Sequence, residues 1–350
     1  MRILIGMSGG LDSTYAAHKL ISEGHTVEGA VLVMHRYTET DAAREAANSL
    51  GIPLHEIDCA ELFEKQVVEN FISEYLSGRT PNPCVVCNSD VKFFALYSYA
   101  KSNGFDMIAT GHYASISSKQ DEKGVLYSIV RAKDSKKDQT YMLWRLPQNI
   151  LSSLLFPLSD IEKSEAKADA RNIGLASVER GESQEICFIP DNDYASFIEN
   201  RRGVSPKGNF IDNDGKILGE HKGIIRYTVG QRKGLGIAMG ERVFVTKIDP
   251  LANTVTLSAD DSYANRIEIS GIVFSGKREP KPGEEMILAV KVRYLAPPVE
   301  AVFSYLGNGR GTARLSSSVR AVTLGQSAVF YDGNELALGG FIDKATLEQS

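Results

Sequence analysis

The chain has 350 residues, which predicts two or three domains at about 100 to 200 residues each. Its 43% hydrophobic and 24% charged residues are ordinary for a globular protein and exclude a disordered or fibrous chain. The net charge of −5 argues against attraction of nucleic acid by the whole surface, although it leaves room for a local basic face.

No apolar run approaches the roughly 18 residues of a membrane span, and the N-terminal MRILIGMSGG is too short and too rich in glycine for a signal peptide. We therefore expect a cytoplasmic protein with no membrane partner.

The segment 1–110 alternates short β-branched runs with amphipathic stretches, which predicts a parallel α/β fold. In chain order the expected elements are a strand over 2–7, a helix over 12–23, a strand over 26–33, a helix over 41–50, a strand near 55–57, a helix over 60–76, another helix after the PNPC segment, and a strand over 106–109. Right-handed crossovers place the loops after the strands on one edge of this doubly wound sheet, where such folds bind ligands.

From about residue 200 onward, glycines become frequent and long helical periods vanish. Short runs such as RVFVTKID, NTVTLS, EMILAVKVRY and VEAVFSYL are separated by turn residues, which predicts antiparallel β structure. The stretch 201–208 is the expected boundary between the two halves.

Residues 6–13 read Gly6, Met7, Ser8, Gly9, Gly10, Leu11, Asp12 and Ser13, between a predicted strand and a predicted helix. The adjacent glycines let the backbone turn and direct N–H groups at an anion, while the serines add hydroxyl groups at the positive end of the helix. The loop lacks the lysine of a Walker motif. The string SGGLDS resembles the PP-loop of ATP pyrophosphatases, whereas a plain glycine turn capped by serine is the alternative.

Two further positions point to a nucleotide at the same place. Leu32 at the end of the second strand and Gly111 after a later strand are expected on the same sheet edge, where an adenine and a ribose would lie.

The four cysteines are too sparse for a disulfide scaffold. Cys84 and Cys87 form a Cys-x-x-Cys pair after two prolines, with Asn88 expected to cap the following helix. A structural zinc half-site is the alternative, but there is no second pair of cysteines. Cys187 has hydrophobic flanks that suit either an ordered active-site segment or a buried thiol, and Cys59 reads as a buried structural thiol.

Eight motifs occur in order across nearly the whole chain: SGGLDS, GRTPNPCVVCN with VKF, ATGHYA, DSKKDQTYML, ESQEICFI, YTVGQRKGLG, VRYL and LGQSAVFYDG. Together they resemble the tRNA 2-thiouridylases (MnmA/TrmU family). The resemblance implies a PP-loop ATP-pyrophosphatase domain over 1–200, a small central tRNA-contacting domain over 201–265 and a C-terminal β-barrel over 266–350. It also implies ATP-dependent 2-thiolation of the wobble uridine of tRNA.

The resemblance further implies how the reaction proceeds and which residues take part. ATP with Mg²⁺ adenylates the uracil C2 oxygen of a base flipped out of the anticodon loop, and a sulfur donor protein or sulfide supplies the sulfur. The catalytic pair is Cys87 and Cys187, and ATP binds 6–13, Leu32 and Gly111. The tRNA contacts map to Asn82, Pro83, Cys84, His112, Lys137, Asp138, Gln139, Arg293, Tyr294 and Gln326. Without the resemblance, His112 reads as a structural histidine.

This chain has a cysteine, Cys84, where the family pattern has an aspartate. A role of that carboxylate as acid or base therefore cannot be transferred. Cys84, Cys87 and Cys187 together could ligate three irons of a [4Fe–4S] cluster and leave the fourth for sulfide. In the alternative scheme, Cys187 carries a persulfide and a Cys87–Cys187 disulfide remains after transfer. The sequence leaves both sulfur chemistries open.

Two rival functions compete with tRNA thiolation. A PP-loop enzyme that amidates or ligates a small molecule needs only the segment 1–110, and a non-catalytic RNA-binding module needs neither the loop nor the cysteines. A basic cluster is an expected phosphate contact or, alternatively, a solvated face; it consists of Arg131, Lys133, Lys136, Lys137 and Arg145.

Overall fold

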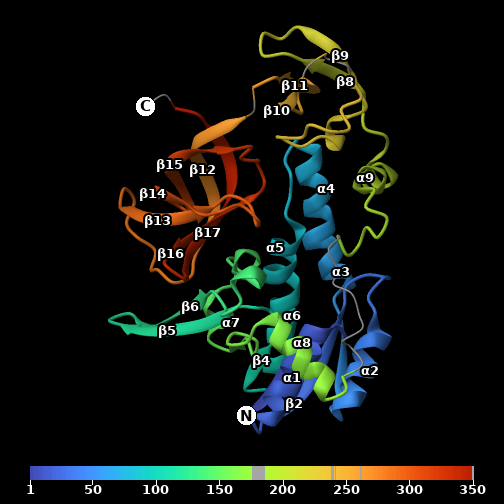
Figure 1. Ribbon diagram of the computed structural model, residues 1–350, viewed down its shortest axis with the longest axis vertical. Helices are drawn as coiled ribbons and strands as arrows, with labels where there is room; N and C mark the ends of the chain where they lie inside the picture. Colours follow the sequence, from blue (N-terminus) through green and yellow to red (C-terminus); the bar gives the residue numbers. More distant parts are fainter. Residues whose placement is uncertain (176–185, 238–239, 241, 261, 349–350) are drawn as a thin grey trace.

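The computed structural model describes residues 1–175, 186–237, 240, 242–260 and 262–348, and the structural statements below concern those residues. The motif around Cys187 begins at residue 182, so its first four residues lie outside this part of the chain. Figure 1 shows the parallel sheet at one end, a small β unit at the other, and a barrel at the side. No helix of these residues is long and apolar enough to span a membrane.

The N-terminal domain contains a five-stranded parallel sheet in the order β3-β2-β1-β4-β7. Its strands are β1 (Arg2–Gly6), β2 (Thr26–Val33), β3 (Leu54–Asp58), β4 (Met107–Ala109) and β7 (Leu154–Leu155). Side chains alternate between its faces: Ile3 and Ile5 pack with one helical layer, and Leu4 packs with the other. The predicted doubly wound fold is confirmed.

The two layers come from helices spread along the N-terminal domain. Helices α1 (Leu11–Ser22), α2 (Thr40–Leu50) and α8 (Lys163–Asn172) supply residues to the first layer, and α6 (Phe93–Ser102) and α7 (Gln148–Leu151) supply residues to the second. Both faces of the sheet are therefore covered, as a parallel sheet requires.

Two long helical stretches contain π-helical turns. Between α3 (Ala60–Phe63) and α4 (Glu69–Leu76) lies the turn Glu64–Val68, and between α5 (Pro83–Cys87) and α6 lies the turn Asn88–Lys92. The prediction that Asn88 caps a new helix is wrong, because the helix continues through this residue. Its buried amide instead donates to the Met142 carbonyl at 3.0 Å.

The small β unit is a four-stranded sheet in the order β10-β11-β8-β9. Its strands are β8 (Gly208–Ile211), β9 (Ile217–His221), β10 (Phe244–Asp249) and β11 (Thr254–Ser258). The expectation of purely antiparallel pairing is wrong for one pair, since β11 and β8 run parallel. Helix α9 (Tyr194–Arg202) continues across the predicted domain limit at residue 200. The domain limits themselves stay a prediction.

The C-terminal barrel is a six-stranded sheet that closes through the pairing of β12 with β17. Its strands are β12 (Tyr263–Phe274), β13 (Glu285–Lys291), β14 (Val299–Gly307), β15 (Arg310–Arg320), β16 (Ser327–Asp332) and β17 (Glu335–Thr346). A hairpin of the N-terminal domain, β5 (Ser115–Asp121) and β6 (Gly124–Val130), extends the same sheet through Val130 and Glu335. The hairpin projects beside the barrel in Figure 1.

The barrel is joined to the N-terminal domain by a buried contact. Trp144 is fully buried, and its indole N–H donates to Ser327 Oγ at 3.0 Å. A Cβ on Gly339 would lie 2.5 Å from the Trp144 ring, so only glycine allows this approach. The Tyr141 hydroxyl also donates to the Ser327 carbonyl at 2.9 Å.

Candidate active site

The phosphate loop connects β1 with the N-terminus of α1 and is held by its own serines. Ser8 N–H donates to Ser13 Oγ at 3.2 Å, and Ser13 Oγ donates to the Gly10 carbonyl at 3.1 Å. Asp12 in the first turn accepts Lys163 Nζ at 2.9 Å and the Tyr113 hydroxyl at 3.3 Å. The loop is thereby fixed with the positive end of α1 facing the space in front of it.

Two glycines are required by close packing at this loop. Gly9 has φ +74°, and a Cβ there would lie 2.4 Å from the Ala42 backbone at the start of α2. A Cβ on Gly111 would lie 2.6 Å from the Asp12 backbone. The segment after β4 therefore packs directly against the phosphate loop.

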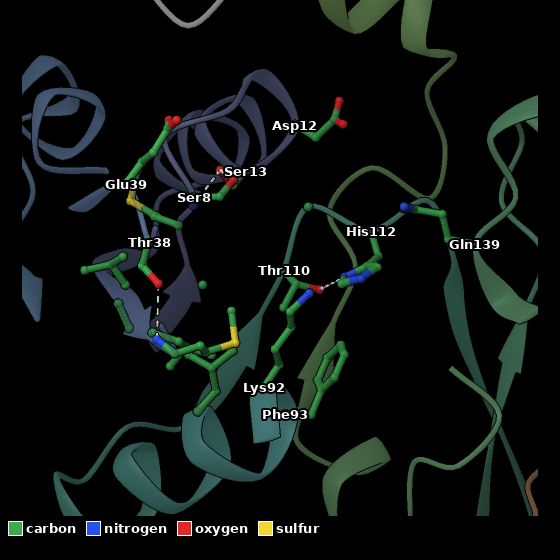
Figure 2. A pocket seen from close by; sticks show the side chains of 18 residues that line it. Ser8, Asp12, Ser13, Thr38, Glu39, Lys92, Phe93, Thr110, His112 and Gln139 are labelled. Atoms are coloured by element: carbon green, nitrogen blue, oxygen red, sulfur yellow. Dashed lines mark hydrogen bonds between the residues drawn. The ribbon is translucent and has the colours of Figure 1, made fainter. Parts of the chain in front are cut away.

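A cavity of about 300 Å³ opens beside the loop, a size at the lower end of small-molecule sites. Figure 2 shows its lining, which comes from β1, β2, the loop before α2, α6 and the segment after β4. The lining residues are Gly6, Met7, Ser8, Asp12, Ser13, Ala30, Val31, Leu32, Met34, Thr38, Glu39, Lys92, Phe93, Leu96, Thr110, Gly111, His112 and Gln139. Five residues of the predicted loop thus share one cavity with Leu32 and Gly111.

Of the two predicted catalytic cysteines, Cys87 lies next to this cavity, and Cys187 lies in a segment that packs in the same core as Cys87. Cys87 is buried at the end of α5, and its Sγ lies 3.8 Å from Sδ of Met34, a lining residue. Cys187 is exposed, and the next residue, Phe188, packs in the same core as Cys87. The Phe188 ring lies 5.4 Å from Phe71, which fixes the Cys187 segment against α4. All four cysteines of the chain are free thiols.

The thiols are electrostatically linked to one another and to Lys92. Burial raises the pKa of Cys87 to about 12, against the opposing effect of the Lys92 ammonium group. Desolvation by the atoms around it also raises the pKa of Cys187, and Lys92 again opposes the shift. Cys84 and Cys187 influence Cys87 in turn, so the three cysteines share one electrostatic environment.

His112 stands at the other side of the cavity. Its Nδ1 and the Thr110 hydroxyl are 2.9 Å apart, and burial lowers the pKa of the imidazole to about 3, with Lys92 adding to the shift. His112 is therefore uncharged near neutral pH when no anion is bound beside it.

Most of the predicted tRNA contacts form a connected group between the N-terminal domain and the barrel. Gln139 Oε1 accepts the Tyr113 N–H at 2.9 Å, and the Tyr141 and Tyr294 rings lie 5.9 Å apart. Asn82 Nδ2 lies 3.6 Å from the Met142 sulfur. Pro83 and the exposed Cys84 begin α5, directly after Asn82.

Several predicted RNA contacts also have structural partners. Gln326 Nε2 donates to the Thr80 carbonyl at 3.0 Å and so holds the segment before Asn82. Asp138 accepts the Thr140 N–H at 3.0 Å and pairs with Arg131 at 3.4 Å. Arg293 donates to the Arg320 carbonyl at 3.2 Å.

The basic cluster is only partly available to RNA. Arg145 pairs with Asp90 at 2.9 Å and Lys133 pairs with Glu165 at 3.1 Å. Lys136 is exposed and Lys137 is partly exposed.

Sequence reasoning missed three charged residues of the cavity and its surroundings. Glu39 and Lys92 line the cavity, and Lys163 binds Asp12 from α8. The VKF string contains Lys92, but its spacing of five positions from Cys87 does not place both on one face of an ordinary α-helix. Lys163 and Asp12 are far apart in the chain, beyond any local signal.

Thiol reactivity should follow this geometry. The thiolate is the reacting form, and the pKa of Cys87 lies far above neutral pH, so its alkylation by iodoacetamide should accelerate about tenfold per pH unit up to about pH 12. Exposed Cys84 should be alkylated first. Peptide mass mapping over time measures both rates, with Cys59 as a second buried thiol for comparison; burial raises its pKa to about 11, so it should react more slowly than Cys84 and no more slowly than Cys87. Equal rates for Cys84 and Cys87 near neutral pH would contradict the assignment.

Comparison with known proteins supports one family along nearly the whole chain. A family profile described as tRNA methyl transferase HUP domain matches residues 1–191, a tRNA methyl transferase PRC-barrel domain matches 195–259, and an aminomethyltransferase beta-barrel domain matches 265–342.

Full-length relatives carry a consistent name. The tRNA-specific 2-thiouridylase MnmA of Clostridium botulinum strain Alaska E43 is 40% identical, with 98% of each chain covered. MnmA 2 of Clostridium botulinum strain Hall is 42% identical, also with 98% of each chain covered. The MnmA of Clostridium acetobutylicum is 41% identical and covers 97% of this chain and 99% of its own. With this identity over nearly its whole length, the chain belongs to the tRNA-specific 2-thiouridylase (MnmA) family.

Proposed function

We propose that this protein uses ATP to replace the C2 oxygen of the wobble uridine of tRNA by sulfur. The observation that carries the proposal is the contact between the sulfur-transfer site and the ATP site. Cys87 touches Met34, which lines the cavity of the phosphate loop. A sulfur-bearing thiol and an activated phosphate ester can then meet at one base.

Adenylation comes first, because the C2 oxygen of uracil is a poor leaving group. The oxygen attacks the α-phosphorus of ATP, an O–P bond forms, and the bond to pyrophosphate breaks. The N–H groups at the start of α1 would stabilise the phosphate charge. ATP would enter as its magnesium complex, for which the Asp12 and Glu39 carboxylates in the lining are oxygen donors of the preferred kind.

Sulfur transfer follows from the positions of the two cysteines. The terminal sulfur of a persulfide on Cys187 attacks C2, and AMP leaves with the former C2 oxygen. The Cys87 thiolate then attacks Cys187 Sγ, which releases the 2-thiouridine and leaves a Cys87–Cys187 disulfide. Sulfide can renew the persulfide by attacking Cys187 Sγ of the disulfide, which breaks the S–S bond and releases the Cys87 thiolate. Alternatively, a thiol reductant opens the disulfide, and the Cys187 thiolate then takes the outer sulfur of a persulfide on a sulfur donor protein, whose own thiolate leaves.

The iron–sulfur alternative has suitable donors in kind, since thiolates are the ligands of such clusters. We assign no step to a cluster, and the set Cys84, Cys87 and Cys187 stays a prediction.

The decisive experiment incubates anaerobically purified protein with unmodified tRNA, MgATP and a low-molecular-weight persulfide as the sulfur donor, and measures pyrophosphate and 2-thiouridine. We expect both products and a dependence of pyrophosphate release on tRNA. Pyrophosphate without tRNA would indicate a small-molecule ligase, and tRNA binding without either product would indicate an RNA-binding module.

The same preparation tests the cluster. Iron-free protein that thiolates at full rate would exclude it. A thiolate-to-iron absorbance band that disappears together with activity in Cys84→Ser would instead exclude the simple persulfide scheme.

RNA binding should depend on charges at the junction of the two domains. Replacing Lys137 and Arg293 by glutamine should weaken tRNA binding and reduce the slope of log K against log salt by about 1.5, because each phosphate contact contributes about 0.7 to 0.9. Titrations at several salt concentrations measure this slope. Arg44→Gln on α2, which pairs with Glu56, is the control and should leave it unchanged. An unaltered slope in the double variant would place the contacts elsewhere.

A further inference from the structure

Lys92 has an unusual position in the helix that carries the cysteines. It ends the π-helical turn Asn88–Lys92, in which the Phe93 N–H donates to the Asn88 carbonyl. Residues five apart on an α-helix point about 140° away from each other. A turn bonded from i to i+5 brings them closer to one face, and such turns recur at functional sites. The widened turn thus directs Lys92 to the side of the helix where Cys87 lies.

The side chain reaches the cavity from the wall opposite the phosphate loop. Figure 2 shows Lys92 extending toward Thr110, with Ser8 and Ser13 across the cavity. In the described lining Lys92 is the single lysine or arginine, and the acidic groups there are Asp12 and Glu39. Since His112 is uncharged near neutral pH, this described lining has one permanent cation.

This cation has no acidic partner in the part of the chain that the structure describes. Burial by itself lowers the pKa of Lys92, and negative charge on Cys87, Cys84 and Cys187 raises it above the ordinary value, but Cys87 carries no such charge near neutral pH and no carboxylate contributes. Asp12 is already bound by Lys163. An ammonium group in such surroundings is favourable only when an anion joins it.

We propose that Lys92 is a catalytic residue whose ammonium group binds the α-phosphate, first of ATP and then of the adenylated uridine. The inference rests on the proposed function. As the O–P bond forms and pyrophosphate leaves, Lys92 compensates negative charge on the α-phosphate oxygens. When sulfur attacks C2, the C2–O electron pair passes to the oxygen of AMP, and the same ammonium group stabilises this leaving group. Lys92 thus provides, from the cysteine side, the positive charge that the phosphate loop itself lacks.

The test compares Lys92→Met and Lys92→Arg with the matched control Lys101→Met, an exposed lysine further along α6. In Lys92→Met, the rate of tRNA-dependent pyrophosphate release should fall about 10²- to 10³-fold. A loss of this size is typical when an enzyme loses one hydrogen-bond donor that stabilises negative charge in the transition state. Lys92→Arg should recover a measurable part of this rate, and Lys101→Met should match the wild type. tRNA affinity should be unchanged in all three variants.

Thermal unfolding separates catalysis from structure. Without ATP, Lys92→Met should melt no lower than the wild type, because methionine removes an unpaired charge and keeps the volume. Its stabilisation by ATP should shrink. A rate within threefold of the wild type would overturn the inference, and so would equal loss in both variants with a lowered melting temperature. Full pyrophosphate release with loss of thiolation alone would also overturn it, since Lys92 would then serve the cysteines. An inactive wild type in the same assay would contradict the proposed function itself.

Discussion

Serine in place of Cys187 is expected to abolish formation of 2-thiouridine while a single turnover of pyrophosphate release continues. The phosphate loop and its cavity do not depend on this thiol, whereas in the proposed scheme Cys187 is the residue that carries the transferable sulfur. Loss of a nucleophile of this kind costs at least about three orders of magnitude in rate. Nucleoside analysis of the tRNA and a pyrophosphate assay, run on the same samples, measure the two steps separately.

The fold should survive this change. Phe188, rather than Cys187, anchors the segment, through ring contacts with Phe63 and Phe71 at 5.5 and 5.4 Å. Cys59→Ala is the matched control, since Cys59 is also a thiol of the N-terminal domain but caps α3 without a side-chain hydrogen bond. Its thiolation rate should remain within about twofold of the wild type. Thiolation by Cys187→Ser at the parental rate would show that sulfur reaches the base by another route.

Alanine in place of Asp12 should eliminate productive ATP binding and reduce thiolation more than about 100-fold. The carboxylate holds Lys163 and the Tyr113 hydroxyl and lines the cavity, so its loss releases α1 from α8 and removes an oxygen donor for the magnesium of ATP. Ser13→Ala should act in the same direction, because Ser13 Oγ links Ser8 to Gly10. The stabilisation of the protein by ATP in thermal unfolding measures the effect.

A second ion pair gives the control for this result. Lys19 on α1 pairs with Asp160, outside the cavity lining, so Asp160→Ala also removes a link between α1 and the segment before α8. It should retain ATP binding and thiolation, and tRNA affinity should persist in every variant. If Asp12→Ala still thiolates at the parental rate with ATP limiting, the phosphate loop has been misassigned.

The parallel domain could be predicted closely because its signals are local. Strand β2 begins and ends at the predicted positions, Thr26 and Val33, since four of its eight residues are β-branched and favour a strand. The hairpin β5–β6 was missed for the opposite reason. Most of β5 is polar, and β6 joins the barrel through the pairing of Val130 with Glu335, which is distant in the chain.

The sequence motifs predicted which residues belong to the site, but they did not predict how all of these residues are arranged in space. The phosphate loop, Leu32 and Gly111 do share one cavity, because the ends of parallel strands meet at one sheet edge. Lys92 escaped notice, since a π-helical turn changes which residues share a helix face and has no sequence signature of its own. The roles of the individual residues stay predictions until the variants are measured.

The burial of Trp144 under the barrel determines how this chain can be divided. A fragment that stops before β12 would expose a fully buried indole and tyrosine on the catalytic half, together with the hydrogen-bond partners that Ser327 satisfies. Such a fragment should aggregate rather than work as a smaller enzyme. The barrel therefore cannot be exchanged as an independent module during evolution or engineering unless its replacement brings a glycine and an acceptor to the same place.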